Sequence, residues 1–124
     1  MLKKCLVLCL LFLTTLAVDA GVYESALEKN KKVFLYLHSE RCKYCLNFEP
    51  VYLKVSNMYG EKCKFLKVNA ETDEGRHLMR LFGARYVPFV IIADSDKQEI
   101  SQIEPNCLIN FKCTNYYVDR FIRR

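Results

Sequence analysis

Flexible linkers, basic tracts and long hydrophobic runs are scarce in this chain of 124 residues. With 4 glycines and 3 prolines it has no internal repeat, low-complexity tract or interdomain linker, which predicts a single domain. Its 19 Lys and Arg outnumber its 14 Asp and Glu, but the charges are interspersed, so we expect no nucleic-acid partner. No apolar run reaches the ~20 residues of a membrane-spanning helix, which disfavours an uncleaved anchor.

The first twenty residues have the pattern of a secretory signal peptide. Lys3 and Lys4 precede an apolar run over 5–18, and Val18-Asp19-Ala20 offers small residues at the two positions that a signal peptidase reads. We therefore expect residues 1–20 to be a signal peptide cleaved after Ala20, and residues 21–124 to be one domain exported to the periplasm.

Cys42-Lys43-Tyr44-Cys45 lies where the apolar run 33–37 gives way to a segment with helical spacing. The first half-turn of a helix would bring both sulfurs to one side, and the helix N-terminus would favour a thiolate at Cys42. Arg41 and Lys43 flank Cys42 and add two positive charges with the same effect. This setting favours reversible disulfide chemistry over a structural disulfide or half of a metal site.

The remaining pattern alternates helices and strands. Helices are predicted over 22–31, 40–59, 73–82 and 114–124, and strands over 32–38, 62–69, 87–93 and 98–103. Pro50 should kink the second helix. Asp73 is the expected cap of the third, which should turn Leu78, Leu81 and Phe82 inward. The order α-β-α-β-α-β-β-α predicts an α/β domain.

Pro88 opens the third predicted strand, where a proline is tolerated only at an edge or a first position. A cis Val87–Pro88 bond there would be a deliberate feature, because cis is a minority state. The CxxC after a strand, Pro50 five residues beyond Cys45, and Pro88 after Phe82-Gly83-Ala84-Arg85-Tyr86-Val87 together resemble the thioredoxin-like superfamily over residues 22–124.

The resemblance implies a thioredoxin-like fold, with a central mixed sheet of about four strands flanked by helices, and a protein thiol–disulfide oxidoreductase that needs no cofactor. Cys42 would be the attacking thiolate and Cys45 the more buried resolving thiol. A cis Pro88 would lie against the pair and present the backbone of Val87 to an extended substrate, and Tyr44 would add an apolar rim, as would Phe89 unless it is simply packed.

Several positions depart from the thioredoxin pattern. The chain has no tryptophan, so Arg41 stands where thioredoxins usually have Trp, and Lys43-Tyr44 replaces Gly-Pro. The family's buried acid falls at Tyr36, which puts a general reductase in doubt. Lys67 would then lack its usual partner and be exposed. Glu40 and Tyr36 are alternative proton relays.

His38 and the other three cysteines of the expected domain are interpreted separately. His38 could tune Cys42 or pack at the edge of the site. Cys107 and Cys113 form a structural disulfide if the last helix begins at Thr114, but would point to different faces if the stretch between them were helical. The expected domain has five cysteines, an odd number that leaves at least one thiol unpaired, and Cys63, on a strand, is expected to be a buried inert thiol.

We expect the protein to act on thiols and disulfides of other proteins as a monomer, with a membrane-bound redox partner and with the reductase or isomerase direction favoured. Two alternatives remain. One is a structural zinc module built from Cys42, Cys45, Cys107 and Cys113, although their spacing fits zinc poorly and no metal is expected. The other is a peptide-binding chaperone that uses only the groove at Pro88.

Overall fold

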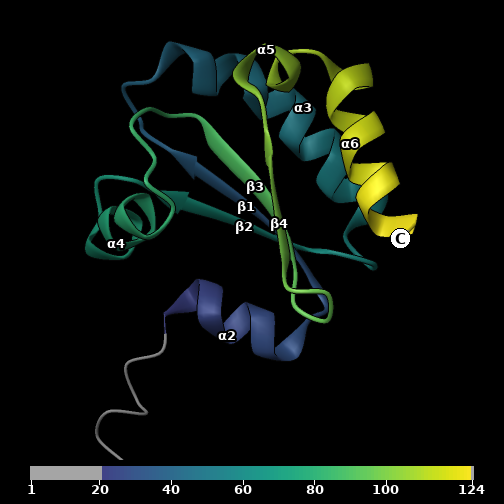
Figure 1. The fold of residues 1–124 in the computed structure, drawn as a ribbon. Coiled ribbons are helices and arrows are strands. Elements are labelled where there is room, and N and C mark those ends of the chain that lie inside the picture. The colour runs from purple at the N-terminus through teal and green to yellow at the C-terminus, as the bar shows by residue number, and fades with distance from the viewer. Residues whose placement is uncertain (1–20, 124) are drawn as a thin grey trace, which may run out of the picture.

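The computed structural model describes residues 21–123 and contains one four-stranded sheet between two layers of helices (Figure 1). The expected signal peptide lies outside these residues. Within them, no helix combines the length and apolar character needed to cross a bilayer. In chain order the elements are α2 (Val22–Lys29), β1 (Lys32–His38), α3 (Lys43–Tyr59), β2 (Lys64–Asn69), α4 (Asp73–Leu81), β3 (Phe89–Asp94), β4 (Glu99–Ile103), α5 (Pro105–Leu108) and α6 (Phe111–Arg123).

The sheet is mixed, with strand order β2-β1-β3-β4. The pairing of β1 with β2 is parallel, whereas β3 pairs antiparallel with both β1 and β4. The parallel pair needs a crossover, and α3 provides it. This arrangement confirms the thioredoxin-like α/β fold expected from the sequence.

Side chains alternate across β1 and so divide the core between the two faces of the sheet. Phe34 and Tyr36 face the layer that contains α3 and α6, where they pack with Phe48 and Val118. Val33, Leu35 and Leu37 face α2 and α4 on the opposite side. All five are completely buried, because helices cover both faces of this central strand.

Two details of α4 differ from the sequence-based expectation. Its N-cap is Thr72 rather than Asp73, because the Thr72 hydroxyl accepts a hydrogen bond from the backbone N–H of Gly75 at 3.1 Å. Leu81 is 52 % exposed instead of facing inward, whereas Leu78 is buried as expected. Leu81 is the last residue of α4, and the residue after it, Phe82, packs against the core that contains Leu78.

The C-terminal segment contains a helix that the sequence pattern did not indicate. The four-residue α5 lies directly after β4, and α6 begins at Phe111 instead of Thr114. Cys113 is therefore helical, yet it forms a disulfide with Cys107, across a Cα–Cα distance of 5.2 Å. The break between α5 and α6 at Ile109 and Asn110 turns the chain, so the two sulfurs do not lie on one continuous helix.

Candidate active site

Cys42 is the N-cap of α3, and its Sγ accepts a hydrogen bond from the backbone N–H of Cys45 at 3.0 Å. The two cysteines form a disulfide with a Cα–Cα distance of 5.2 Å. Cys42 is half-buried, whereas Cys45 is 4 % exposed and belongs to the core between α3 and the sheet. One sulfur is therefore accessible at a helix N-terminus and the other lies beneath it.

The segment before β3 lies against this disulfide. The Val87–Pro88 peptide bond is cis, and the carbonyl oxygen of Val87 is 3.5 Å from Cys42 Sγ. β3 itself begins at Phe89, one residue after the proline. Phe89 packs in the core against Phe82, with ring centroids 6.2 Å apart, so the interpretation of Phe89 as a rim residue is wrong.

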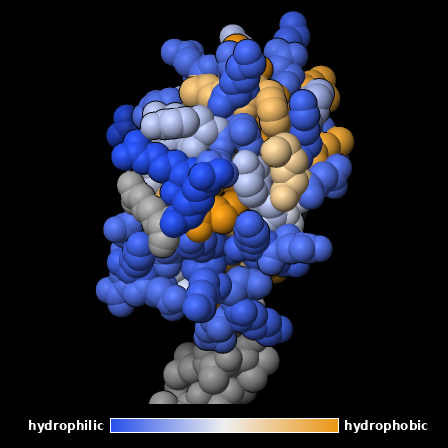
Figure 2. Space-filling model, turned by 90° about the vertical axis from the view of Figure 1, so that its right-hand side faces the viewer, coloured by the Kyte–Doolittle hydropathy of each residue, from blue (hydrophilic) through white to orange (hydrophobic). Residues whose placement is uncertain are grey.

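An apolar groove of about 380 Å³ lies beside the disulfide. Three of its lining residues were expected from the sequence: Tyr44, Val87 and Pro88. Tyr86, Pro105, Asn106 and Ile109 complete the lining, so α5 and the residue after it form the far wall. Both α5 and the start of α3 lie at one end of the molecule (Figure 1), where Figure 2 shows hydrophobic surface interrupted by hydrophilic side chains. The wall from α5 was missed because a four-residue helix has no periodicity to detect.

The residues expected to tune Cys42 lie around it in different settings. Arg41 and Lys43 are exposed on either side of Cys42. His38 ends β1, with its ring centroid 5.6 Å from that of Tyr36. Burial lowers the pKa of His38, the positive charge of Lys67 lowers it further, and the carboxylates of Glu49 and Glu40 oppose the shift. Glu40, an alternative proton relay, is exposed.

Glu49 is a site residue that the sequence analysis missed. Its carboxylate lies 2.5 Å from Lys67 Nζ, so Lys67 has an acidic partner although Tyr36 occupies the family's acid position. The Tyr36 hydroxyl lies 3.3 Å from both Glu49 Oε2 and the carbonyl oxygen of Cys45. The spacing contained a signal, because residues four apart on a helix share a face, and Glu49 follows Cys45 by four.

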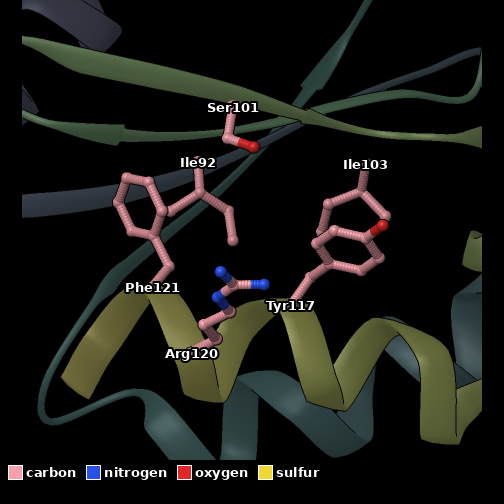
Figure 3. A pocket seen from close by; sticks show the side chains of 6 residues that line it. All are labelled: Ile92, Ser101, Ile103, Tyr117, Arg120 and Phe121. Atoms are coloured by element: carbon pink, nitrogen blue, oxygen red, sulfur yellow. The ribbon is translucent and has the colours of Figure 1, made fainter. Parts of the chain in front are cut away.

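The free cysteine and a second cavity lie apart from this groove. Cys63 is a free, buried thiol whose pKa is raised to about 12, mainly by burial. The second cavity, of about 140 Å³, lies between β4 and α6 and shares no lining residue with the groove. Figure 3 shows Arg120, Tyr117 and Phe121 reaching from α6 toward Ser101, Ile92 and Ile103 of the sheet.

The zinc alternative requires four cysteines to converge on one point. Instead, Cys42 is bonded to Cys45 and Cys107 to Cys113. Across residues 21–123, no group of three His, Cys, Asp or Glu side chains is arranged to hold a metal ion. The geometry therefore favours disulfide chemistry over a zinc module.

Comparisons with known proteins agree with this geometry. The thioredoxin family model matches residues 14–111. A chloroplastic thioredoxin-like protein, HCF164, from Oryza sativa subsp. japonica is 25 % identical over 87 residues, which are 70 % of this chain and 33 % of the rice protein. The chain thus spans about a third of the length of the curated relatives that it matches.

Solved structures show the same fold. The J-Trx1 fragment of ERdj5 matches with a TM-score of 0.70 and 17 % identity, over 82 % of this chain and 48 % of that one. The oxidised thioredoxin of Plasmodium falciparum matches with a TM-score of 0.65 and 18 % identity, over 81 % and 89 %. The chain belongs to the thioredoxin family, and its Cys42–Cys45 disulfide is of the CxxC type.

Proposed function

We propose that this protein exchanges disulfides with cysteines of exported polypeptides, through the Cys42–Cys45 pair. In the reducing direction, the Cys42 thiolate attacks a substrate disulfide, forms a mixed disulfide and releases one substrate thiolate. Cys45 then attacks the sulfur of Cys42 and releases the second thiolate. Two electrons pass to the substrate and the Cys42–Cys45 disulfide is formed.

The observation that carries this proposal is the position of Cys42 between a helix N-terminus and a groove. Its sulfur accepts the N–H of Cys45, which would stabilise a thiolate once the pair is reduced. The Val87 carbonyl lies 3.5 Å from the same sulfur and is part of the groove lining. A polypeptide bonded to Cys42 would therefore run along the apolar side chains of that groove.

The direction of electron flow is part of the proposal, and we favour reduction or isomerisation of substrate disulfides. Arg41, Lys43 and the helix N-terminus stabilise the thiolate and so act in the oxidising direction. Against them, residues 21–123 contain no inserted helical domain of the kind found in dedicated disulfide oxidases. A membrane-bound electron donor would keep the pair reduced in the periplasm, where the monomer would act after cleavage at Ala20.

Separate alanine variants of the two cysteines test the mechanism. Cys42→Ala should abolish reduction of a disulfide-bonded peptide, because no nucleophile remains at the groove. Cys45→Ala should form mixed disulfides and fail to release them, which mass spectrometry under non-reducing conditions detects. Equal residual activity in both variants would contradict these roles, and full activity of Cys42→Ala would favour a chaperone that uses the groove alone.

The equilibrium between the Cys42–Cys45 disulfide and a series of glutathione buffers tests the direction. We expect a reduction potential below that of the periplasmic oxidant class, in the range of reductases or isomerases. A potential as high as that of a strong oxidase would reverse the proposed direction while leaving the exchange chemistry intact.

A further inference from the structure

The second cavity has an apolar floor and room for one large side chain. Ser101 on β4 is the register partner of Ile92 and lies on the same face of the strand as Ile103, two residues further on. Both isoleucines are buried and line the cavity, whereas the small serine side chain leaves space in front of α6. The cavity measures about 140 Å³, and an apolar cavity of about 150 Å³ in another protein holds benzene.

A cation without a carboxylate partner lies at the rim of this cavity. Arg120 projects from α6 into the gap between helix and sheet, and Ser101 lies on the opposite wall (Figure 3). Its guanidinium donates a hydrogen bond to the Tyr116 hydroxyl at 3.3 Å, but no ion pair within the described part of the chain includes it. The adjacent carboxylate, Asp119, is paired with Arg123 at 3.0 Å. Arg120 is therefore available to bind an anion through two parallel hydrogen bonds.

The C-terminal end of α6 does not repel an anion at this position. The last carbonyl groups of a helix carry partial negative charge. Lys32 on β1 donates from its Nζ to the carbonyl oxygens of Phe121 and Ile122, at 3.0 Å and 2.7 Å. This ammonium group offsets the charge of the carbonyls and places a second cation near the same end of α6.

The outer edge of β4 is open beside the cavity. β4 is the last strand in the order β2-β1-β3-β4, and no other strand of the described residues pairs with its outer side. Edge strands are usually blunted by lysine, proline or a bulge. β4 contains neither lysine nor proline, and its pairing with β3 runs without a bulge. An extended polypeptide can therefore add its backbone hydrogen bonds to this edge.

We propose that the second cavity binds the C-terminal residue of a partner polypeptide that ends in a large apolar side chain. The terminal carboxylate accepts hydrogen bonds from the Arg120 guanidinium. The side chain, of the size of leucine or phenylalanine, fills the space against Ile92, Ile103 and Phe121, and the preceding residues extend along the edge of β4. The site shares no lining residue with the groove beside the disulfide, so its failure would leave the proposed function standing.

NMR titration of the 15N-labelled protein with the peptide acetyl-Gly-Thr-Val-Phe, which has a free C-terminal carboxylate, tests this site. Amide signals should shift for the residues of β4 and α6 that line the cavity and stay in place for the residues of the groove. The same peptide with an amidated C-terminus should bind about tenfold or more weakly, because a charge-assisted hydrogen bond is lost. A peptide that ends in glycine should lose a similar factor, because the cavity stays empty.

Variants of the protein separate the role of Arg120 from a general effect of charge. Arg120→Gln should weaken binding of the carboxylate peptide about tenfold and leave binding of the amidated peptide unchanged. Ser101→Leu should abolish binding of both peptides by filling the cavity. Arg80→Gln is the matched control, because it removes an exposed arginine from α4 on the other side of the sheet (Figure 1). Wild-type amide spectra away from the cavity verify the fold of each variant.

Equal affinity for the free and amidated peptides, or equal effects of Arg120→Gln and Arg80→Gln, would overturn the proposal. Shifts confined to the groove would do the same. The acid 3-phenylpropanoate supplies the carboxylate and the ring without a peptide backbone, and it should bind about tenfold more weakly than the peptide, because it makes no backbone hydrogen bonds. Equal affinity for this acid would overturn the polypeptide partner and assign the cavity to a small carboxylic acid.

Discussion

The surroundings of each cysteine determine what its sulfur can do. Cys42 caps a helix at the edge of an apolar groove, where a thiolate is stabilised and accessible. Cys45, one turn into the same helix, is buried in the core between α3 and the sheet. Cys63 is also buried but lines neither the groove nor the second cavity, and burial raises its pKa to about 12.

Cys63 should therefore resist alkylation in the folded protein. At pH 8 a thiol with a pKa of about 12 is ionised in only about one molecule in ten thousand, and the thiolate is the reactive form. In protein cleaved after Ala20, which lacks Cys5 and Cys9, iodoacetamide should leave the native oxidised form unlabelled and should add one label after unfolding in denaturant without reductant. Cys63→Ser should remain unlabelled in both states. Rapid labelling of the native protein would show that Cys63 is accessible.

The sequence indicated the attacking and resolving cysteines and the proline beside them, because their spacing along the chain is itself the signal. Glu49 gave a weaker signal, since its contacts are with Tyr36 and Lys67 on two different strands. The family pattern also directed attention to an acid on β1, whereas this chain supplies its carboxylate from α3. Such contacts between elements become visible only when the register of β1 against β2 is known.

At the scale of elements, short segments set the local geometry. The N-terminus of α4 depends on the Thr72 hydroxyl, which accepts the N–H of Gly75. Gly75 itself allows close packing, because a Cβ at this position would lie 1.9 Å from the carbonyl oxygen of Asn69. These two residues fix where α4 leaves the end of β2.

Thr72→Ala should lower the free energy of unfolding by about 1 kcal/mol, since it removes a side-chain cap. Asp73→Ala should have a smaller effect, because Asp73 is fully exposed and contributes an ion pair with Arg76 on the surface of the helix. Urea unfolding of both variants measures the difference. A larger loss for Asp73→Ala would mean that Asp73 is the effective cap, as the sequence pattern first suggested.

Ile109 lines the groove, so its truncation should weaken peptide binding. Ile109→Ala should raise KM for a disulfide-bonded peptide with large apolar residues beside its cysteines, and leave the reaction with a small soluble disulfide unchanged. Ile100→Ala is a matched control, because Ile100 on β4 is exposed to nearly the same extent, 58 % against 56 %. Equal KM values for the two variants would show that this wall of the groove does not contact the peptide.

The long, periodic elements were predictable, and the short ones were not. The strand over 32–38 was predicted with its observed bounds, because five consecutive buried residues leave a continuous apolar run. The helix α5 and the early start of α6 escaped prediction, because a disulfide and a chain reversal override helical periodicity between Pro105 and Thr114. Thr72 was missed because adjacent Thr and Asp are both good caps.

On the scale of the whole molecule, two buried tyrosines lie in the core between the sheet and the layer of α3 and α6. Tyr36 and Tyr52 pack there with ring centroids 5.1 Å apart, and Tyr52 also contacts Phe34 and Phe65. Burial raises the pKa of Tyr52 from 10.0 to about 12, with Glu49 adding to the shift. The core between the layers therefore contains groups that ionise far more easily once the chain unfolds.

This difference predicts unfolding in alkali. Because the folded pKa is raised, the contribution of Tyr52 to stability is fully present below pH 10 and is lost as pH rises toward about 12. Denaturant unfolding at intervals between pH 8 and 12 should show this fall, and Tyr52→Phe should reduce its slope. Tyr116→Phe, at an exposed position, should leave the slope unchanged. If the free energy of unfolding fell equally steeply with pH in both variants, Tyr52 would not be the source of the loss of stability.

The bridge between Cys107 and Cys113 joins α5, a wall of the groove, to α6. Each newly synthesised copy must have two of its own thiols oxidised before that wall is secured. Maturation of the protein thus depends on the same kind of thiol–disulfide exchange that it is proposed to catalyse. A compartment too reducing for disulfides to form in its substrates would also leave the Cys107–Cys113 bridge unformed.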